Sequence, residues 1–170
     1  MTTVVFQRDE SGFHFVSDSQ STGEDGTIRR TDKVFRIDGH VIGMAGSASI
    51  LSLILLARFH PLETCRTPDR HLSMCVAGSL RSSYRDLFPP AGHIGVPTFN
   101  LLVAHEKVDT FYKLNGRFGV DESSDRFLSI GSGSLLAREN YVRHPSANPV
   151  DHVKSAAQED PYTSGPFISY

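Results

Sequence analysis

The first residues of the chain could form a nucleophile. Thr2 follows Met1, and an initiator methionine is commonly removed before so small a side chain. Thr2 would then carry a free α-amine beside its hydroxyl. A threonine hydroxyl is a weak nucleophile by itself, and a neighbouring N-terminal amine is a recognised way to activate it. Because an ordinary α-amine has a pKa of about 8, much of it can accept a proton near neutral pH.

Two charged residues could complete such a site. Asp18 follows a predicted strand, and Lys33 begins another. An Asp18 carboxylate near Lys33 would keep the ammonium charged. The ammonium, held between Asp18 and Thr2, would stabilise negative charge on the threonine oxygen and leave the amine neutral enough to act as a base. Taken singly, such residues are most often a solvated edge lysine and a turn aspartate, so only the combination predicts chemistry.

Other polar motifs are less informative. The segment G-S-G-S at 131–134 precedes a predicted helix, where it could bind a phosphate. It lacks the lysine of a P-loop and the full dinucleotide pattern, so we do not expect a nucleotide cofactor. The eight histidines form no H-E-x-x-H motif, and we expect no metal or other cofactor.

Strand and helix patterns surround these residues. Strands at 4–8 and 13–17 form a hairpin, 21–32 is a loop or weak edge pair, and Asp38-Gly39 joins strands at 33–37 and 40–45. Further strands are predicted at 98–104, 108–114, 117–120, 127–130 and 167–169. Helices are predicted at 49–59, 68–87, 134–143 and from 149, with Asn148 as the N-cap. The order of hairpins and helix pairs predicts an α+β fold, a four-layer αββα sandwich of two antiparallel sheets between helix pairs, as one domain over 1–170.

Composition excludes several functional classes. A net charge of −2 argues against nucleic acid or an anionic membrane as the main partner. The longest apolar run, Ile50 to Ala57, is too short to span a bilayer. The two cysteines form no C-x-x-C motif, which favours reduced thiols and a cytoplasmic protein.

Six segments together resemble the proteasome β-subunits, which are N-terminal-nucleophile hydrolases, and the bacterial proteasome-like peptidase that works with a heat-shock ATPase. The segments are T-T-V-V at Thr2, S-D-S-Q-S-T-G at Ser17, K-V-F-R-I at Lys33, G-M-A-G-S-A-S at Gly43, G-S-G-S at Gly131 and D-P-Y-T-S-G-P-F at Asp160. No single segment is specific, but their order and spacing nearly match the family. The loop between Asp18 and Lys33 is one residue shorter than is usual there.

The resemblance implies a role for each matching residue. It makes Thr2 the nucleophile, with Asp18 and Lys33 as its ion pair, and Gly46 a backbone donor to the oxyanion. An outer set around the threonine amine would consist of Ser132, Asp160 and Thr163. Substrate-binding positions would be Ser21 and Thr22, on a strand edge that pairs with an extended peptide, together with Met44 and Ser47.

The resemblance thus implies a threonine endopeptidase that cuts unfolded polypeptides. It also implies a homo-oligomeric ring or similar assembly and a possible ATPase unfoldase partner. Two alternatives stay open. The chain could be a non-catalytic assembly subunit, although such a subunit has no need to retain the Thr2, Asp18 and Lys33 set. It could also be an amidase of small acyl substrates, because a fold does not determine its substrate.

Overall fold

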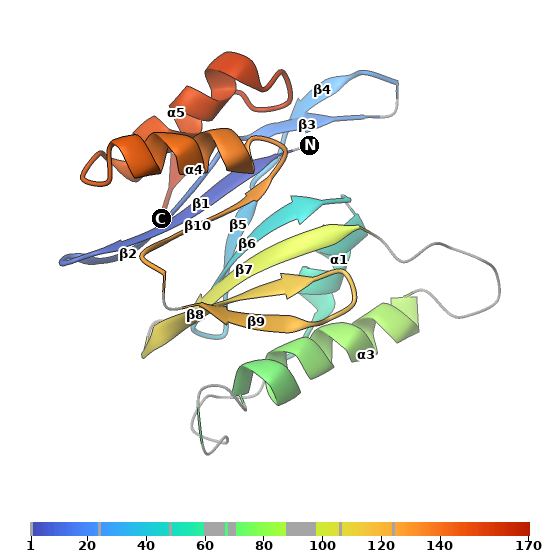
Figure 1. The fold of residues 1–170 in the computed structure, drawn as a ribbon. Coiled ribbons are helices and arrows are strands. Elements are labelled where there is room, and N and C mark those ends of the chain that lie inside the picture. Colours follow the sequence, from blue (N-terminus) through green and yellow to red (C-terminus); the bar gives the residue numbers. More distant parts are fainter. Residues whose placement is uncertain are drawn as a thin grey trace. The chain divides into compact units, whose positions relative to one another are not determined.

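A computed structural model describes residues 2–23, 25–47, 49–59, 67, 71–87, 98–105, 107–123 and 125–170 (Figure 1). The described chain divides into two compact units. The first comprises Met1–Phe35, Gly43–Ala45 and Asp125–Tyr170, and the second comprises Arg36–Ile42 and Gly46–Ser124. The single domain over 1–170 stays a prediction. None of the described helices is long and apolar enough to cross a membrane.

The first unit contains an antiparallel sheet in the order β10-β1-β2-β11. Its strands are β1 (Thr3–Asp9), β2 (Gly12–Ser17), β10 (Phe127–Gly131) and β11 (Ile168–Ser169). The predicted hairpin of β1 and β2 is confirmed. In the register of β1, Thr3 lies opposite Gly131 and Val4 opposite Ser17. The ends of β2 and β10 that carry Ser17 and Gly131 therefore flank the start of β1.

Two helices cover one face of this sheet, α4 (Ser134–Arg143) and α5 (Pro149–Glu159) (Figure 1). Alternate strand residues and one stripe of each helix form the core between them: Val5, Val16, Phe127, Ala137, Val153 and Ala156. The Asn148 side chain accepts a hydrogen bond from the Val150 amide, and Pro149 is the first helical residue, as predicted. This core fixes the ends of both helices relative to β1.

A two-stranded ribbon follows β2 in the first unit. It pairs β3 (Gln20–Thr22) with β4 (Ile28–Arg30), so that of the two alternatives predicted for 21–32, a loop or a weak edge pair, the structure has the edge pair. The Asp25 carboxylate organises the turn by accepting hydrogen bonds from the amide and the hydroxyl of Thr27. All of β4 is exposed, whereas Gln20 at the start of β3 is buried.

A five-stranded sheet has the order β5-β6-β7-β8-β9, and parts of its first two strands belong to the first unit. The strands are β5 (Val34–Ile37), β6 (His40–Gly46), β7 (Phe99–His105), β8 (Val108–Asn115) and β9 (Val120–Ser123). Asp38 and Gly39 have φ angles of 51° and 77°, which suit the predicted two-residue hairpin turn.

The strand predicted at 117–120 was placed too early, because 117–119 are turn and irregular residues and β9 starts at Val120. The Asn115 side-chain oxygen accepts hydrogen bonds from the amides of Arg117 and Gly119, which lengthens the turn beyond two residues. Phe118 also has a φ of 60°, a conformation incompatible with a strand.

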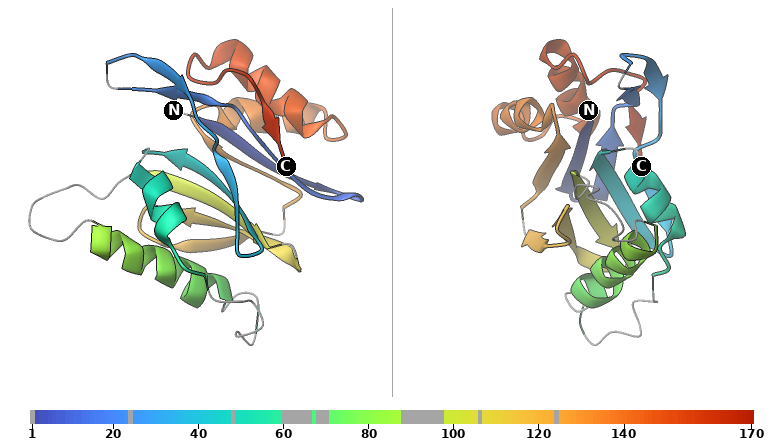
Figure 2. Two further views of the ribbon diagram at one scale, coloured as in Figure 1. Left: turned by 180° about the vertical axis from the view of Figure 1, so that it is seen from behind. Right: turned by 90° about the vertical axis from the view of Figure 1, so that its right-hand side faces the viewer.

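The helices of the second unit are α1 (Ser49–Leu56), the π-helical η2 (His71–Val76) and α3 (Ala77–Leu87). Figure 2 shows α1 and α3 on one face of the sheet. The prediction of a helix over 49–59, buried on most sides, is corrected: α1 ends at Leu56 and leaves Leu55 and Leu56 more than half exposed. The predicted start of the next helix, Pro68, lies outside the described residues.

Candidate active site

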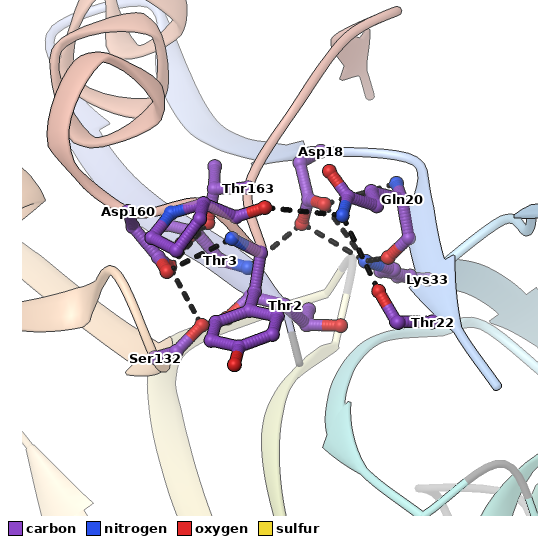
Figure 3. Close-up of polar contacts among 11 residues, drawn as sticks. Thr2, Thr3, Asp18, Gln20, Thr22, Lys33, Ser132, Asp160 and Thr163 are labelled. Carbon is purple, nitrogen blue, oxygen red and sulfur yellow. Dashed lines mark hydrogen bonds and ion pairs between the residues drawn. The ribbon is translucent and has the colours of Figure 1, made fainter. Parts of the chain in front are cut away.

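Asp18 and Lys33 form a buried ion pair in the first unit (Figure 3). Asp18 follows the end of β2, and Lys33 precedes β5. The Nζ of Lys33 lies 3.0 Å from Oδ1 and 2.9 Å from Oδ2 of Asp18, and it also donates to the Gln20 carbonyl. The Asp18 carboxylate accepts two further hydrogen bonds, from the amides of Thr3 (2.7 Å) and Gln20 (3.0 Å). These hydrogen bonds offset part of the cost of removing both charges from water.

Burial dominates the protonation of this pair. Burial raises the pKa of Asp18 above its ordinary value, although the Lys33 charge and the amides oppose the shift. Burial lowers the pKa of Lys33, against the opposing charge of Asp18. Both shifts arise because a low dielectric disfavours the charged form of each group. Lys33 therefore releases a proton more readily than an exposed lysine does.

Thr2 is held through its backbone beside this pair. Its carbonyl accepts a hydrogen bond from the Ser132 amide (2.8 Å) and lies 3.5 Å from the Ser132 hydroxyl. The amide of the next residue, Thr3, donates to Asp18. The Thr2 side chain is buried, with 6% of the residue exposed.

The expectation that Lys33 lies between Asp18 and Thr2 stays a prediction. An ammonium has three N–H donors, and the hydrogen bonds of Lys33 within the described chain go to Asp18 and the Gln20 carbonyl. The structure gives no hydrogen bond between Lys33 and the Thr2 hydroxyl, both of which are described residues. The physical reason is that Asp18 and the start of β3 already take these donors.

Three predicted residues meet in a second cluster of the first unit. The Asp160 Oδ2 accepts hydrogen bonds from the hydroxyls of Ser132 (2.6 Å) and Thr163 (2.7 Å). The other oxygen accepts from the Tyr162 amide. Burial raises the pKa of Asp160, but the hydrogen bonds from Ser132, Thr163 and the Tyr162 amide outweigh it and hold the pKa below its ordinary value. Asp160 is thus an ionised acceptor at the end of α5.

Thr3 and Gln20 join the two clusters, and sequence reasoning missed both. The Thr3 amide bonds to Asp18, while its hydroxyl oxygen lies 2.6 Å from that of Thr163. Gln20 bonds to Asp18 and Lys33 through its backbone. In the sequence, Thr3 is simply the second residue of a threonine pair and Gln20 the first residue of a weak strand. Neither position has a signal that separates it from an ordinary strand residue.

The G-S-G-S segment has a structural explanation. A Cβ built on Gly131, which has a φ of 98°, would lie 1.7 Å from the Thr2 carbonyl oxygen. A Cβ on Gly133 would lie 2.3 Å from the Thr3 hydroxyl oxygen. Glycine therefore allows this turn to approach the Thr2-Thr3 backbone closely, and the approach brings Ser132 into contact with Thr2.

The predicted substrate-binding residues fall in both units. In the first, Ser21 and Thr22 are half-buried on β3, and one edge of that strand pairs with β4. Met44 is buried, and its amide donates to the Lys33 carbonyl. In the second unit, Gly46 has a φ of 130°, and a Cβ there would lie 2.3 Å from the Thr98 carbonyl oxygen. The exposed Ser47 donates its amide to the same carbonyl. The placement of Gly46 and Ser47 beside Thr2 stays a prediction.

A metal centre has no support in the part of the chain that is described. Within those residues, no group of three or more His, Cys, Asp or Glu side chains could hold an ion. The described site itself offers a hydroxyl, a lysine and two carboxylates, which suit nucleophilic and general acid–base catalysis.

Comparisons with known proteins identify the fold. No protein-family model matches the sequence, and neither does any curated protein. Solved structures do match. HslV from Trypanosoma brucei is 19% identical, with a TM-score of 0.71 over 99% of this chain and 97% of that one. BPH from Thiobacillus denitrificans, solved in complex with epoxomicin, is 17% identical, with a TM-score of 0.74 over 99% and 96%.

A third match is Anbu, an ancestral β-subunit, from Yersinia bercovieri. It is 17% identical, with a TM-score of 0.74 over 98% of this chain and 80% of that one. HslV and Anbu are proteasome-type N-terminal-nucleophile hydrolases. The chain therefore has the fold of that class, and the predicted α+β, four-layer αββα fold class is confirmed. At such identities the likeness concerns the fold alone.

Proposed function

We propose that the protein is a threonine endopeptidase that hydrolyses peptide bonds of unfolded polypeptides, with the Thr2 hydroxyl as the nucleophile. The observation that carries this proposal is the buried Asp18–Lys33 pair bonded to the amide that follows Thr2. A buried ion pair stabilises a fold little, because desolvation cancels much of its attraction. The presence of this pair is therefore better explained by a role beside the reacting Thr2 hydroxyl than by a contribution to folding stability.

The proposed reaction begins after Met1 is removed. The Thr2 oxygen attacks the peptide carbonyl while its proton passes to the Thr2 amine. The amine then gives this proton to the leaving amine, so that an ester on Thr2 remains. Water hydrolyses the ester and regenerates the hydroxyl. Lys33 stabilises charge on the threonine oxygen, and the Gly46 amide donates to the oxyanion.

The second cluster, formed by Ser132, Asp160 and Thr163, supports these roles of Thr2 and Lys33. Ser132 bonds the Thr2 carbonyl and is itself bonded to Asp160. A carboxylate two hydrogen bonds from Thr2 raises the proton affinity of a nearby amine, because opposite charge favours the ionised form. The positive charge of the buried Lys33 lowers the proton affinity of the same amine. The two clusters together tune the amine toward the range in which a general base works at neutral pH.

Substitution of Thr2 tests the proposal. Thr2→Ala removes the nucleophile, so we expect the cleavage of fluorogenic peptides to fall by at least about 10³-fold with folding unchanged. Thr2→Ser keeps hydroxyl and amine and should retain measurable activity, and Thr27→Ala in the exposed ribbon turn is the matched control. Activity of Thr2→Ala within tenfold of the parent protein would remove the mechanism.

The same preparations distinguish the rival functions. Epoxomicin, present in the Thiobacillus denitrificans structure, is a suitable probe, and mass spectrometry of the N-terminal peptide would report whether it adds covalently to Thr2. Addition with peptide cleavage supports the endopeptidase. Addition with cleavage of small amides alone would favour an amidase. The absence of both addition and cleavage would favour a non-catalytic subunit.

We also propose a homo-oligomer. Large apolar side chains are exposed on the helices of both units, namely Leu55, Leu56 and Met74 in the second and Leu135 and Val142 in the first. Where such residues form a contiguous patch, that patch is typical of a surface covered by another protein. The Anbu complex from Pseudomonas aeruginosa forms a helical assembly, which supports self-association for this chain too. A monomer mass by light scattering at all working concentrations would exclude it. The ATPase partner and the cytoplasmic location stay predictions.

A further inference from the structure

The Gln20 side chain connects two parts of the candidate site that lie far apart in the sequence. Its Nε2 donates to the Pro161 carbonyl (3.2 Å) and to the Thr22 hydroxyl (3.3 Å). Gln20 is 4% exposed. Pro161 lies inside the turn from Asp160 to Thr163. This turn supplies two residues of the second cluster, the acceptor Asp160 and the donor Thr163. Figure 3 shows Gln20 between Lys33 and this turn.

The backbone of Gln20 is fixed independently of its side chain. Its amide donates to Asp18, and its carbonyl accepts from Lys33. The residue is therefore anchored on the ion pair, and only its amide group extends to the Asp160–Thr163 turn. A substitution of the side chain leaves the backbone contacts to Asp18 and Lys33 available, so it tests the link to the turn.

The turn has few other links to the ion pair. Thr3 provides one, through its amide to Asp18 and its hydroxyl to Thr163. The Ser19 amide provides another, to the Ser164 carbonyl at 3.3 Å, just beyond the turn. The Gln20 bond differs from these, because its acceptor is the residue that directly follows Asp160. It therefore constrains the backbone that carries this carboxylate.

We infer that Gln20 is a positioning residue, which holds the Asp160 turn beside Thr2 and so sets how readily the Thr2 amine accepts a proton. The inference rests on the proposed function for its catalytic meaning. The charged side chains of the described clusters around Thr2 are Asp18 after β2, Lys33 before β5 and Asp160 after α5 (Figure 3). Without the Gln20 link, the turn relaxes away from Ser132 and Thr2. Asp160 then raises the proton affinity of the amine less, because its effect falls with distance.

The test measures the amine itself and does not depend on catalysis. In protein shown by intact mass to begin at Thr2, the rate of acetylation of the α-amine is followed against pH by mass spectrometry of the N-terminal peptide. Gln20→Met keeps the side-chain length but removes both donors. We expect it to lower the apparent pKa of the Thr2 amine by at least about 0.5. Gln20→Leu, which also removes both donors and adds no charge, is a second variant in case Gln20→Met fails to fold.

The matched control is Gln158→Met, the same change at an exposed position on α5. It should leave the amine pKa unchanged. An amine pKa within about 0.2 of the parent value in a folded Gln20 variant would overturn the inference. Peptide cleavage is measured in parallel. If the parent protein cleaves no peptide but the amine pKa shifts in the variant, the proposed function fails and the positioning role of Gln20 stands. If the parent protein cleaves peptides but the amine pKa does not shift in the variant, the proposed function stands and the positioning role of Gln20 fails.

Discussion

The ammonium nitrogen of Lys33 lies within 3.0 Å of both carboxylate oxygens of Asp18, and neither side chain is more than 3% exposed. Replacing such a pair with apolar residues is often neutral for stability, whereas removing one partner is costly. Single and double substitutions of this pair can therefore separate its effect on folding stability from its effect on activity.

Lys33→Met should destabilise the fold by about 3–5 kcal/mol, because it leaves the Asp18 carboxylate buried and without its counter-ion. The double variant Asp18→Asn with Lys33→Met removes both charges and should recover much of this loss. Both variants should lack peptidase activity, since neither retains the Lys33 ammonium that stabilises charge on the threonine oxygen in the proposed reaction. Urea denaturation and peptide cleavage measure the two effects. Lys154→Met, in an exposed pair with Asp151, is the control.

A single variant with near-parental stability would show that the Asp18–Lys33 pair is not buried in solution. Near-normal cleavage by Lys33→Met would show instead that the lysine has no part in the reaction. The two results are independent of one another.

Gly133→Ala should destabilise the protein by about 1–3 kcal/mol, the usual range for overpacking. The added methyl group would lie 2.3 Å from the Thr3 hydroxyl oxygen and 3.1 Å from Asp160 Oδ2. Gly78→Ala in α3 is the matched control, because a Cβ there meets nothing within 4 Å. Because alanine loses less backbone entropy than glycine in a helix, that control should be more stable than the parent protein by about 0.5–1 kcal/mol. Equal melting temperatures for both variants would contradict the close approach of 131–134 to Thr3.

Three buried histidines of the second unit, His40, His71 and His105, should make the fold sensitive to acid. The Nε2 atoms of His40 and His71 are 2.8 Å apart, and the ring of His105 lies 4.7 Å from that of His40. Burial, together with the charges of His105 and His71, lowers the pKa of His40 to about 4. The unfolded chain therefore binds more protons than the folded one between about pH 4 and 6.5.

The sign of the effect follows from this difference. The contribution of His40 to stability is fully present above about pH 6.5 and is lost as the pH falls to about 4, a change of about 3 kcal/mol. Urea denaturation at several pH values would measure it. His40→Phe should flatten the acid slope, whereas His144→Phe, at an exposed position, should not. An unchanged slope in His40→Phe would assign the acid sensitivity to other groups.

Protein that retains Met1 should be inactive. While Met1 is attached, the nitrogen of Thr2 is an amide without a basic lone pair, so the hydroxyl has no base. Activity should therefore track the fraction of chains that begin at Thr2. Intact mass and cleavage rate are measured on the same preparations, with and without methionine aminopeptidase. Full turnover by chains that still carry Met1 would mean that an N-terminal threonine is not the catalyst.

Local rules of the sequence predicted much of the fold. The β1–β2 hairpin, the turn at Asp38-Gly39 and the start of α5 at Asn148-Pro149 each depend on neighbouring residues, and the structure confirms all three. The strand predicted at 117–120 failed because the Asn115 side chain bonds to two amides of the turn. A propensity for Asn-Gly turns does not report such a contact.

The sequence by itself determined which residue types could react, because Thr2, Asp18 and Lys33 are identifiable from their chemistry and their order. Only the tertiary structure decided how their hydrogen bonds are distributed. The donors of Lys33 go to Asp18 and Gln20, and Thr3 bonds to Thr163, a residue 160 positions away. The physical reason is that a hydrogen bond depends on distance and angle, which the packing of α4 and α5 on β1 and β2 sets. No local pattern of side chains contains that information.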